Sequence, residues 1–230
     1  MDRYSPRSPH RSERGITMQI TIQQNELKAV SYAIAVKDIR YYLCGVLLES
    51  NGAETRLVAC DGHRLHAVVS FDKDALIVDP VQIILPAAFV KTLLKAKLRK
   101  GELLDINING NKASCAFLDG TEVVCSGIDG KFPDYLRVIP KTVSGEYSPC
   151  NPAYVLDAQD GVRAYLNNKK ANPPDLVYNG DGAAMLAVDR FVAVVMPWRA
   201  DNGHEMPHEA FCRDLQKPNP MPVAVNEVQS

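Results

Sequence analysis

The stretch VACDGHRLH, residues 58–66, gathers side chains that metal sites and hydrolases use. Asp61, His63 and His66 could bind a cation, or an Asp–His pair could activate a nucleophile. Although three candidate ligands are present, the pattern does not indicate that the third would converge with the other two on one metal ion. An Asp-Gly step between two apolar, β-branched runs is also typical of a tight turn between strands. We therefore expect a turn here, with Gly62 allowing it and Asp61 supporting it, and we assign no role to His66.

A second cluster, HEMPHEAFC, places His204, His208 and Cys212 four residues apart, the spacing that aligns ligands on one face of a helix. Pro207 would interrupt that helix, and the surrounding segment is rich in Pro, so we do not expect a metal site there. The sequence contains no GxSxG or phosphate-binding glycine motif, and its one HExxH match, HEMPH at residues 204–208, carries the Pro207 that would interrupt the required helix. We predict no catalysis, no metal and no cofactor.

Composition is that of an ordinary globular protein. The chain has 230 residues, is 46% hydrophobic and carries a formal net charge of −1, which suits one large domain or two small ones. Six Cys occur without a CxxC pair, mostly within apolar runs, as expected for buried thiols in a reducing compartment. No apolar run approaches the roughly 18 residues of a membrane span, so we expect a cytoplasmic protein and no membrane partner.

Apolar periodicity predicts a unit of one strand, one helix and three strands that occurs twice and then begins again. In the first unit we expect a strand at 20–23, a helix at 25–36 capped by Asn25, and strands at 41–49, 56–59 and 65–71. The second unit is expected as a strand at 81–85, a helix at 86–97, and strands at 103–108, 112–118 and 121–126. The third lacks its first strand and is expected as a helix at 152–166 and strands at 176–179, 183–188 and 191–197.

These units predict an α+β fold of repeated βαβββ units, with one complete domain plus a half domain. The expected divisions are an Arg-, Ser- and Pro-rich, disordered extension at 1–17, a complete domain at 18–129, a linker at 130–147, a half domain at 148–199 and a tail at 200–230. Two units together bury one another's apolar faces. Left alone, the odd half would expose a sheet edge and an apolar face, and it therefore implies a partner half, either from another chain or from a packing that the pattern does not predict.

Five segments carry a resemblance to one family. The runs DIRYYLCGVLLES, LVACDGHRLHAVV, IILPAAFVKTLLK, DGKFPDYLRVIPK and FVAVVMPWR resemble successive segments of the β subunit of bacterial DNA polymerase III, the sliding clamp, in order and at compatible spacings. The chain is similar to the middle domain followed by the later half of the last domain. The resemblance implies a DNA-clamp fold, in which helices line a ring around duplex DNA and sheets face outward.

The resemblance also implies a pocket for partner proteins between the middle and last domains. Polymerases and other partners of the family insert a short peptide with a Gln and terminal Leu or Phe residues. Apolar walls would bury the anchors of such a peptide, and a few polar groups would fix its backbone. The matching positions here are Arg40, Leu43, Gly62, His63, Arg64, Leu65, Pro133, Arg137, Val138, Val194, Met196 and Trp198. Apolarity alone would instead make Leu43, Leu65, Val138, Val194 and Met196 core residues, and His63 and Arg64 ordinary surface residues of the turn. Cys60 and Trp198 depart from the residues more often found there, which are Thr and a smaller apolar side chain.

Contact with duplex DNA is implied at the helices and at an aromatic pair. Basic residues along one helix could bind phosphates without reading bases. The predicted DNA-binding residues are Lys37, Tyr41, Tyr42, Lys91, Lys95, Lys97, Arg99 and Lys100. Against this prediction, Ala87 and Ala88 stand where the family commonly has basic residues, and a charged helix is often only a solvated face.

Two functions are compatible with this resemblance. In the first, the chain is a truncated sliding-clamp-like processivity factor that binds clamp-binding motifs of a polymerase or other partner and encircles duplex DNA as a homo-oligomer. If twelve units close a ring and each chain brings three, a tetramer would be needed. In the second, it is a non-encircling adaptor or competitor that binds clamp-binding motifs or a full-length clamp.

Overall fold

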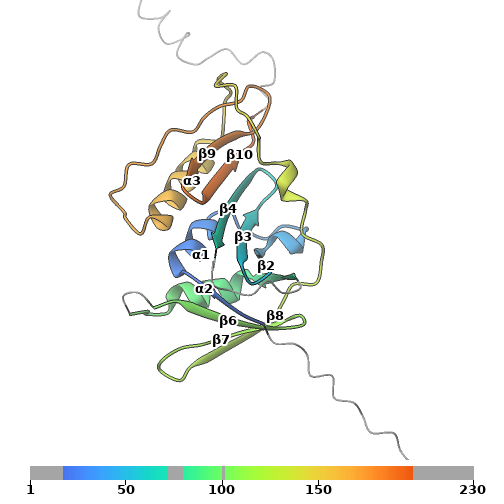
Figure 1. The fold of residues 1–230 in the computed structure, drawn as a ribbon. Coiled ribbons are helices and arrows are strands. Elements are labelled where there is room, and N and C mark those ends of the chain that lie inside the picture. The colour runs from blue at the N-terminus through green and yellow to red at the C-terminus, as the bar shows by residue number, and fades with distance from the viewer. Residues whose placement is uncertain (1–17, 72–79, 100–101, 199–230) are drawn as a thin grey trace, which may run out of the picture. The chain divides into compact units, whose positions relative to one another are not determined.

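The fold consists of three α-helices and two antiparallel sheets within the part of the chain that the structure describes (Figure 1). The computed structural model describes residues 18–71, 80–99 and 102–198. The predicted extension at 1–17, the tail at 200–230 and Lys100 lie outside these residues. The elements are β1 (Met18–Ile22), α1 (Gln24–Ser31), β2 (Gly45–Ser50), β3 (Glu54–Cys60), β4 (Arg64–Phe71), β5 (Val81–Pro86), α2 (Ala87–Lys95), β6 (Leu104–Asn109), β7 (Lys112–Ala116), β8 (Glu122–Ser126), α3 (Pro152–Tyr165), β9 (Ala184–Val188) and β10 (Phe191–Val195).

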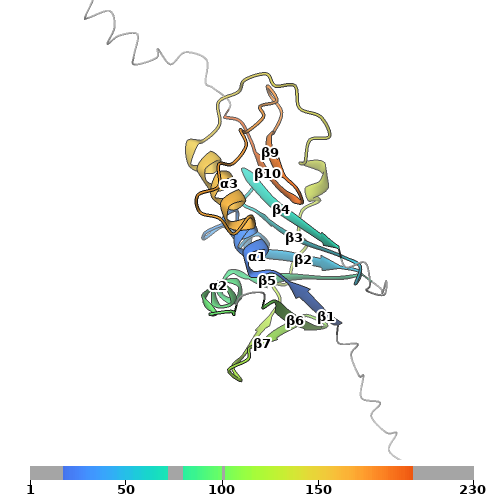
Figure 2. The same ribbon diagram turned by 60° about the vertical axis from the view of Figure 1, so that its left-hand side comes forward.

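The first two repeats exchange their first strands. The four-stranded sheet has the order β1-β6-β7-β8, and the other sheet begins β5-β2-β3-β4. Each sheet therefore takes one strand from one repeat and three from the other. Figure 2 shows the two sheets from the side, with α1 and α2 next to them. Neither repeat can form its sheet alone, which explains why the sequence carries them as a pair.

Alternation along the strands sends side chains to two different apolar clusters. In β4, His66 and Val68 face the side of the sheet on which α1 packs, and Val68 joins the main core there with Leu27, Val30 and Leu93. Leu65 and Ala67 face the opposite side and join a second, smaller cluster. We call this opposite side the outer face. Both faces of the six-stranded sheet are therefore covered in part.

The third repeat continues the sheet of the first. β10 pairs antiparallel with β4, with Leu65 opposite Val194, and β9 follows β10 at the end of the six-stranded sheet. Beside this pair, α3 packs on α1. We call these two contacts, β4 with β10 and α1 with α3, the junction. The expected partner of the odd half is thus the first repeat of the same chain, which covers one edge of β10 and the side of α3 that meets α1.

Several element boundaries differ from those expected. Tyr41–Leu43 forms a 3₁₀ turn before β2 instead of the start of a strand. The first helix ends at Ser31, because the backbone N–H of Ala35 donates to Leu43 and the left-handed conformation at Lys37, with φ of 55°, turns the chain. The predicted strand at 176–179 is reduced to a single bridge between Val177 and Met185.

Asn25 is not the cap of the first helix. That place falls to Gln23, whose backbone N–H donates to Glu26 Oε2 at 3.2 Å. The Asn25 side chain instead donates to the carbonyl oxygen of Tyr165 at 2.6 Å, which ties α1 to the end of α3. Its polar side chain thus serves the junction. None of the described helices has the length and apolar character needed to cross a membrane.

Candidate functional site

The charged stretch that suggested an active site is a turn between β3 and β4. Asp61 Oδ1 accepts hydrogen bonds from the backbone N–H groups of His63 and Arg64 at 2.8 and 3.0 Å, which supports the turn as predicted. Gly62 adopts φ of 90°, a conformation that favours glycine. A Cβ at this position would also lie 2.6 Å from Nη1 of Arg40, so a larger residue would have to displace the Arg40 guanidinium as well.

Arg40 holds the turn from the side. Its Nη2 donates to the carbonyl oxygen of Asp61 at 2.9 Å and pairs with Asp38 Oδ2 at 2.7 Å. Hydrogen bonds from the Arg40 side chain and backbone lower the pKa of Asp38 to about 2. The Asp38 carboxylate therefore stays charged above that pH, and Arg40 is positioned by a pairing of its own rather than by a ligand.

Arg64 connects the turn to α3. Its Nε pairs with Asp61 Oδ2 at 3.0 Å, its Nη1 pairs with Asp157, and its guanidinium lies 4.5 Å from the centre of the Tyr154 ring. The side chain is 12% exposed. Arg64 was predicted to line a pocket, and the structure places it as a brace across the junction, with its charge already matched by two carboxylates.

The predicted apolar walls come together but are packed. Leu43, Leu65 and Val194 are each no more than 1% exposed and belong to the outer-face cluster. Phe132 and Tyr135 cover this cluster from the segment that connects the second and third repeats. These two aromatic residues were missed at the sequence level. Their spacing within KFPDYLRV, in a segment taken for a linker, is the signal that could have identified them.

Tyr135 is anchored by polar groups as well as by packing. Its hydroxyl donates to Glu49 Oε2 at 2.7 Å and accepts a weaker hydrogen bond from Arg56 at 3.4 Å. Burial, with the Glu49 carboxylate as a further cause, raises the pKa of Tyr135 to about 12. The connecting segment is therefore fixed on the outer face and does not act as a free linker at this point.

Two large side chains of the predicted pocket remain exposed directly after β10. Met196 is 39% exposed and Trp198 is 58% exposed. The backbone N–H of Met196 donates to the carbonyl oxygen of His63 at 2.8 Å, and that of Trp198 donates to Pro149 at 2.7 Å. We refer to His63, Met196 and Trp198 as the junction surface. It combines an imidazole, a thioether and an indole at the place where the first and third repeats meet.

The remaining predicted pocket residues lie on the connecting segment. Pro133, Arg137 and Val138 are exposed, and Arg137 pairs with Asp134 at 2.9 Å. A cavity of about 400 Å³ also opens on the outer face, lined in part by Val58, Ala67, Tyr135, Ile139 and Val192. It contains none of the predicted pocket residues, although Val58, Ala67 and Tyr135 belong to the same apolar cluster as Leu65.

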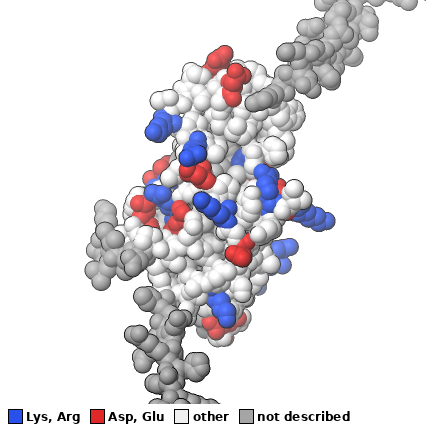
Figure 3. Space-filling model, turned by 90° about the vertical axis from the view of Figure 1, so that its right-hand side faces the viewer, with Lys and Arg blue, Asp and Glu red and all other residues white. Residues whose placement is uncertain are grey.

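Charges are mixed on the side of the molecule where the connecting segment runs. Figure 3 shows this side, and Lys and Arg are interspersed with Asp and Glu there, with neither sign covering it alone. This side would therefore not attract a strongly charged partner through a uniform electrostatic field.

His66, which had no expected role, is fully buried in the junction. Its Nδ1 lies 2.9 Å from the carbonyl oxygen of Ala29 in α1, and its ring meets the Phe191 ring edge-on at 5.5 Å between centres. Its Nε2 has no hydrogen-bond partner among the described residues. Burial lowers the pKa of His66 to about 4, and the nearby Arg64 charge acts in the same direction. The folded protein therefore holds His66 neutral.

Protonation of His66 is expected to destabilise the junction below neutral pH. The pKa is about 4 in the folded state against an ordinary value of 6.5, so the unfolded state takes up a proton first as the pH falls. The free energy of unfolding should then decrease between pH 6.5 and pH 4, by up to about 3 kcal/mol. Denaturant titrations at the two ends of this range would measure it. The variant His66→Met should lose this part of the pH dependence, and an identical dependence in both proteins would contradict the assignment.

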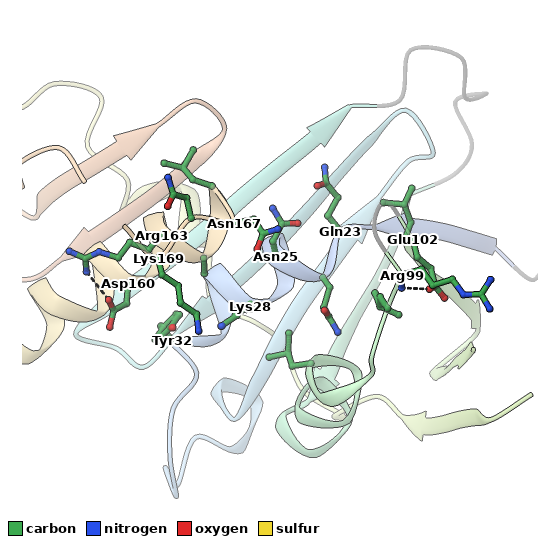
Figure 4. Close-up of a pocket in the computed structure, with 17 residues that line it drawn as sticks. Gln23, Asn25, Lys28, Tyr32, Arg99, Glu102, Asp160, Arg163, Asn167 and Lys169 are labelled. Atoms are coloured by element: carbon green, nitrogen blue, oxygen red, sulfur yellow. Dashed lines mark hydrogen bonds and ion pairs between the residues drawn. The ribbon is translucent and has the colours of Figure 1, made fainter. Parts of the chain in front are cut away.

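The helices form a second candidate surface. A cavity of about 1070 Å³ lies between α1, α3 and the segment after α2, and Figure 4 shows the side chains that surround it. Its basic residues are Lys28, Arg99, Arg163 and Lys169. Asp160 pairs with Arg163 at 2.7 Å, and Glu102 accepts from the backbone of Arg99 at 2.6 Å. Only Arg99 among these four cations was predicted from the sequence.

The other predicted DNA-binding residues that the structure describes lie in two separate places, and all of them are exposed except Tyr42, which is half-buried. Lys91 and Lys95 lie on α2, and Lys97 follows it. Lys95, Lys97 and Arg99 line a cavity of about 590 Å³ beside the turn between β7 and β8. Lys37, Tyr41 and Tyr42 lie before β2, where the two tyrosine rings meet edge-on at 5.9 Å. The structure thus groups the residues after α2 with one another and not with the tyrosines.

Lys28 and Lys91 occupy the same position in the first two repeats. Each stands five residues after the residue that precedes its helix, Gln23 for α1 and Pro86 for α2, and both are exposed. Comparison of the two repeats could have identified Lys28 from the sequence. No group of three His, Cys, Asp or Glu side chains arranged to hold a metal ion occurs within the described ranges.

Comparison with known proteins agrees with this architecture. Residues 18–134, just over half of the chain, match the family model described as "DNA polymerase III beta subunit, central domain". The beta sliding clamp of Pseudomonas aeruginosa is 32% identical over 177 residues, which cover 69% of this chain and 48% of that protein. The beta sliding clamp of Escherichia coli K12 is 34% identical over 136 residues, covering 56% of this chain and 35% of that protein.

Solved structures agree on the fold. A crystal structure of the sliding clamp from Pseudomonas aeruginosa with ligand superposes with a TM-score of 0.64 at 23% identity, covering 79% of this chain and 66% of that one. A putative DNA polymerase III beta subunit from Eubacterium rectale gives a TM-score of 0.64 at 16% identity, covering 80% and 66%. The chain spans about half the length, or less, of the curated relatives that it matches.

Proposed function

Because the chain belongs to the DNA polymerase III beta subunit family, we propose that it is a short sliding-clamp-like processivity factor that holds partner proteins at the junction surface. Clamps of this family are non-enzymatic, and we propose the same for this chain. Its partners would be a DNA polymerase or other proteins with a clamp-binding motif, together with duplex DNA. The proposed divisions are a complete clamp-like domain at 18–129, a connecting segment at 130–147 and a half domain at 148–199.

One observation carries the partner-binding part of this proposal. The hydrogen bond from Met196 to the carbonyl oxygen of His63 joins the third repeat to the Asp61–Arg64 turn, with Met196 and Trp198 exposed beside it. A peptide with apolar terminal residues could bury a thioether and an indole there, and large apolar side chains dominate the binding energy of such contacts. The packed residues Leu43, Leu65 and Val194 would support this surface from below.

Binding of a motif peptide tests this proposal. A labelled peptide with a Gln and terminal Leu and Phe residues should bind in a saturable manner, and fluorescence anisotropy would measure its affinity. A peptide of the same composition in scrambled order is the matched control. Equal binding of both peptides, or binding of neither by the folded protein, would contradict the assignment of the junction surface.

DNA contact through the helices gives a separate prediction. Reversing the charge of both Lys28 and Lys91 to Glu is expected to weaken binding to duplex DNA uniformly across sequences. If each lysine contacts one phosphate, the slope of log affinity against log salt concentration should become less steep by about 2. Titrations at several salt concentrations would measure the slope. Lys141→Glu, on the connecting segment, is the matched control and should leave the slope unchanged.

An alternative function keeps the junction surface and gives up the ring. In that case the chain would be a non-encircling adaptor or competitor for clamp-binding motifs, or would dock on a full-length clamp. Two observations favour the first function. Lys28 and Lys91 are exposed at equivalent positions on two helices, and further cations surround the cavity beside α1. A ring would require a homo-oligomer, and twelve repeats at three per chain correspond to a tetramer.

A further inference from the structure

The last strands of the three repeats differ in how they pair with other strands. These strands are β4, β8 and β10. β4 and β10 pair with each other, whereas β8 pairs only with β7 and forms one end of its sheet within the described residues. Figure 1 shows β8 at the edge of the lower sheet, away from β9 and β10. One repeat of the three therefore has a last strand with a free edge.

Burial differs accordingly between the two equivalent strands. In β4, the residues from Leu65 to Val68 are all buried. In β8, Glu122, Val124 and Ser126 are exposed, and Val124 is 63% exposed. The strand contains one charged residue, Glu122, and neither Lys nor Pro, the residues that commonly protect a free edge from pairing. β8 therefore has the properties of a strand that pairs with another chain.

The helices beside these strands show the same difference. On α1, Asn25 binds Tyr165 of α3, and Ala29 is fully buried beneath α3, where Gly161 allows the two backbones to approach. Ala88 and Thr92 stand at the same distances from Pro86 as Asn25 and Ala29 do from Gln23. Both are small and exposed on α2. The face of α2 that corresponds to the α3-binding face of α1 is thus open and permits close helix packing.

The equivalence of α1 and α2 also indicates what would happen to Lys91 if a helix packed on α2. Its equivalent on α1, Lys28, remains exposed although α3 packs on the neighbouring Ala29. A helix placed on Ala88 and Thr92 would therefore leave Lys91 accessible. Occupation of the α2 face and contact of Lys91 with DNA are compatible.

From this arrangement we propose that the β8 edge and the Ala88–Thr92 face of α2 bind the same surface of a second copy of this chain. A copy's β10 and α3 are already taken by its own β4 and α1, so its free last strand is β8. Two copies would then be related by a two-fold axis, with β8 antiparallel to β8 and α2 against α2, as β4 meets β10 and α1 meets α3 within one chain. The exposed Val124 side chains would lie near this axis.

Whether this contact helps to form a ring around DNA rests on the proposed function, but the contact itself does not. A two-fold contact at β8 would join two chains into one arc, with a third repeat at each end. Two such arcs joined through their third repeats would contain the twelve repeats of a ring. The contact itself is independent of the junction surface, which lies on the other sheet.

Solution mass tests the contact. Light scattering after gel filtration should give a dimer, or a multiple of it, for the wild type. Val124→Lys places like charges near the axis and is expected to raise the dissociation constant of the contact by at least about tenfold. Thr142→Lys, an exposed position on the connecting segment and away from both sheet ends, is the matched control and should leave this contact intact.

Three results would overturn the proposal. They are a monomeric wild type over a wide range of concentration, an unchanged mass for Val124→Lys, and dissociation by Thr142→Lys alone. Hydrogen exchange of the wild type provides a second measurement that needs no variant. The amides of β8 should become protected as the concentration rises, and concentration-independent exchange there would also count against the contact. Motif-peptide binding by Val124→Lys separates a failure of this contact from a failure of the junction surface.

Discussion

Replacing Met196 and Trp198 together with Ala is expected to weaken binding of a motif peptide by about 2 kcal/mol, or roughly 30-fold. Both side chains are exposed, and their backbone N–H groups, which hold the strand end to His63 and Pro149, are unchanged by the substitution. The free energy of unfolding should therefore stay within about 0.5 kcal/mol of the wild type. Titration of the labelled peptide against both proteins would measure the loss of affinity.

The control for this experiment is Leu118→Ala. Leu118 is 71% exposed and lies in the turn between β7 and β8, on the other sheet. Its removal should leave the affinity unchanged. Wild-type affinity in the folded double variant would show that Met196 and Trp198 do not anchor the peptide. Leu43 and Leu65 are poor choices for this test, because truncating a packed leucine costs about 2 to 5 kcal/mol of stability in itself.

The second large effect is expected at Gly161, where α3 meets α1 and β4. A Cβ on Gly161 would lie 2.7 Å from Phe191 Cζ, 3.2 Å from His66 Nδ1 and 3.3 Å from the carbonyl oxygen of Ala29. Gly161→Leu should separate α3 from both elements and lower the free energy of unfolding by about 3 kcal/mol. Because Phe191 lies in β10, and Met196 and Trp198 of the junction surface follow this strand directly, peptide affinity should fall as well.

Denaturant titration measures the stability part of this prediction, and Ala153→Leu is the matched control. Ala153 is exposed in the first turn of the same helix, so a leucine there adds volume without meeting a neighbour. Gly161→Ala is less informative, since the gain in helix propensity, about 1 kcal/mol, opposes the crowding. A Gly161→Leu protein as stable as the wild type would show that the two helices can part without cost.

Much of the local structure follows from short-range signals in the sequence. Apolar periodicity locates α3 to within a residue, and the Asp61-Gly62 step marks the turn between β3 and β4. The exchange of first strands between the two repeats cannot be predicted from these signals. β1 pairs with β6, more than eighty residues away, and the periodicity of a strand does not indicate which strand it pairs with. Tyr41–Leu43 is aromatic and apolar like a strand, and its 3₁₀ turn depends on contacts made elsewhere.

For the candidate site, too, the sequence predicts some features and leaves others open. The resemblance assigns Leu43, Leu65 and Val194 to a pocket wall, whereas apolarity alone makes them core residues, and the structure buries all three in one apolar cluster. Arg64 was expected to face a ligand, and its pairing with Asp157 depends on a helix almost a hundred residues away. Phe132 and Tyr135 were overlooked because the Pro-rich segment that carries them was treated as a linker. Sequence patterns therefore do not predict the role of a side chain when that role depends on a contact with a residue far away in the chain.

Retention on DNA is the most direct test of a clamp-like role. The protein would be assembled on closed circular duplex, separated from free protein by gel filtration, and the circle would then be cut with a restriction enzyme. The proposed function predicts retention on the circle and release when the circle is cut, because a ring slides off a free end. Release from circular and linear DNA at the same rate, by a protein that still binds the motif peptide, would contradict encirclement and favour the adaptor.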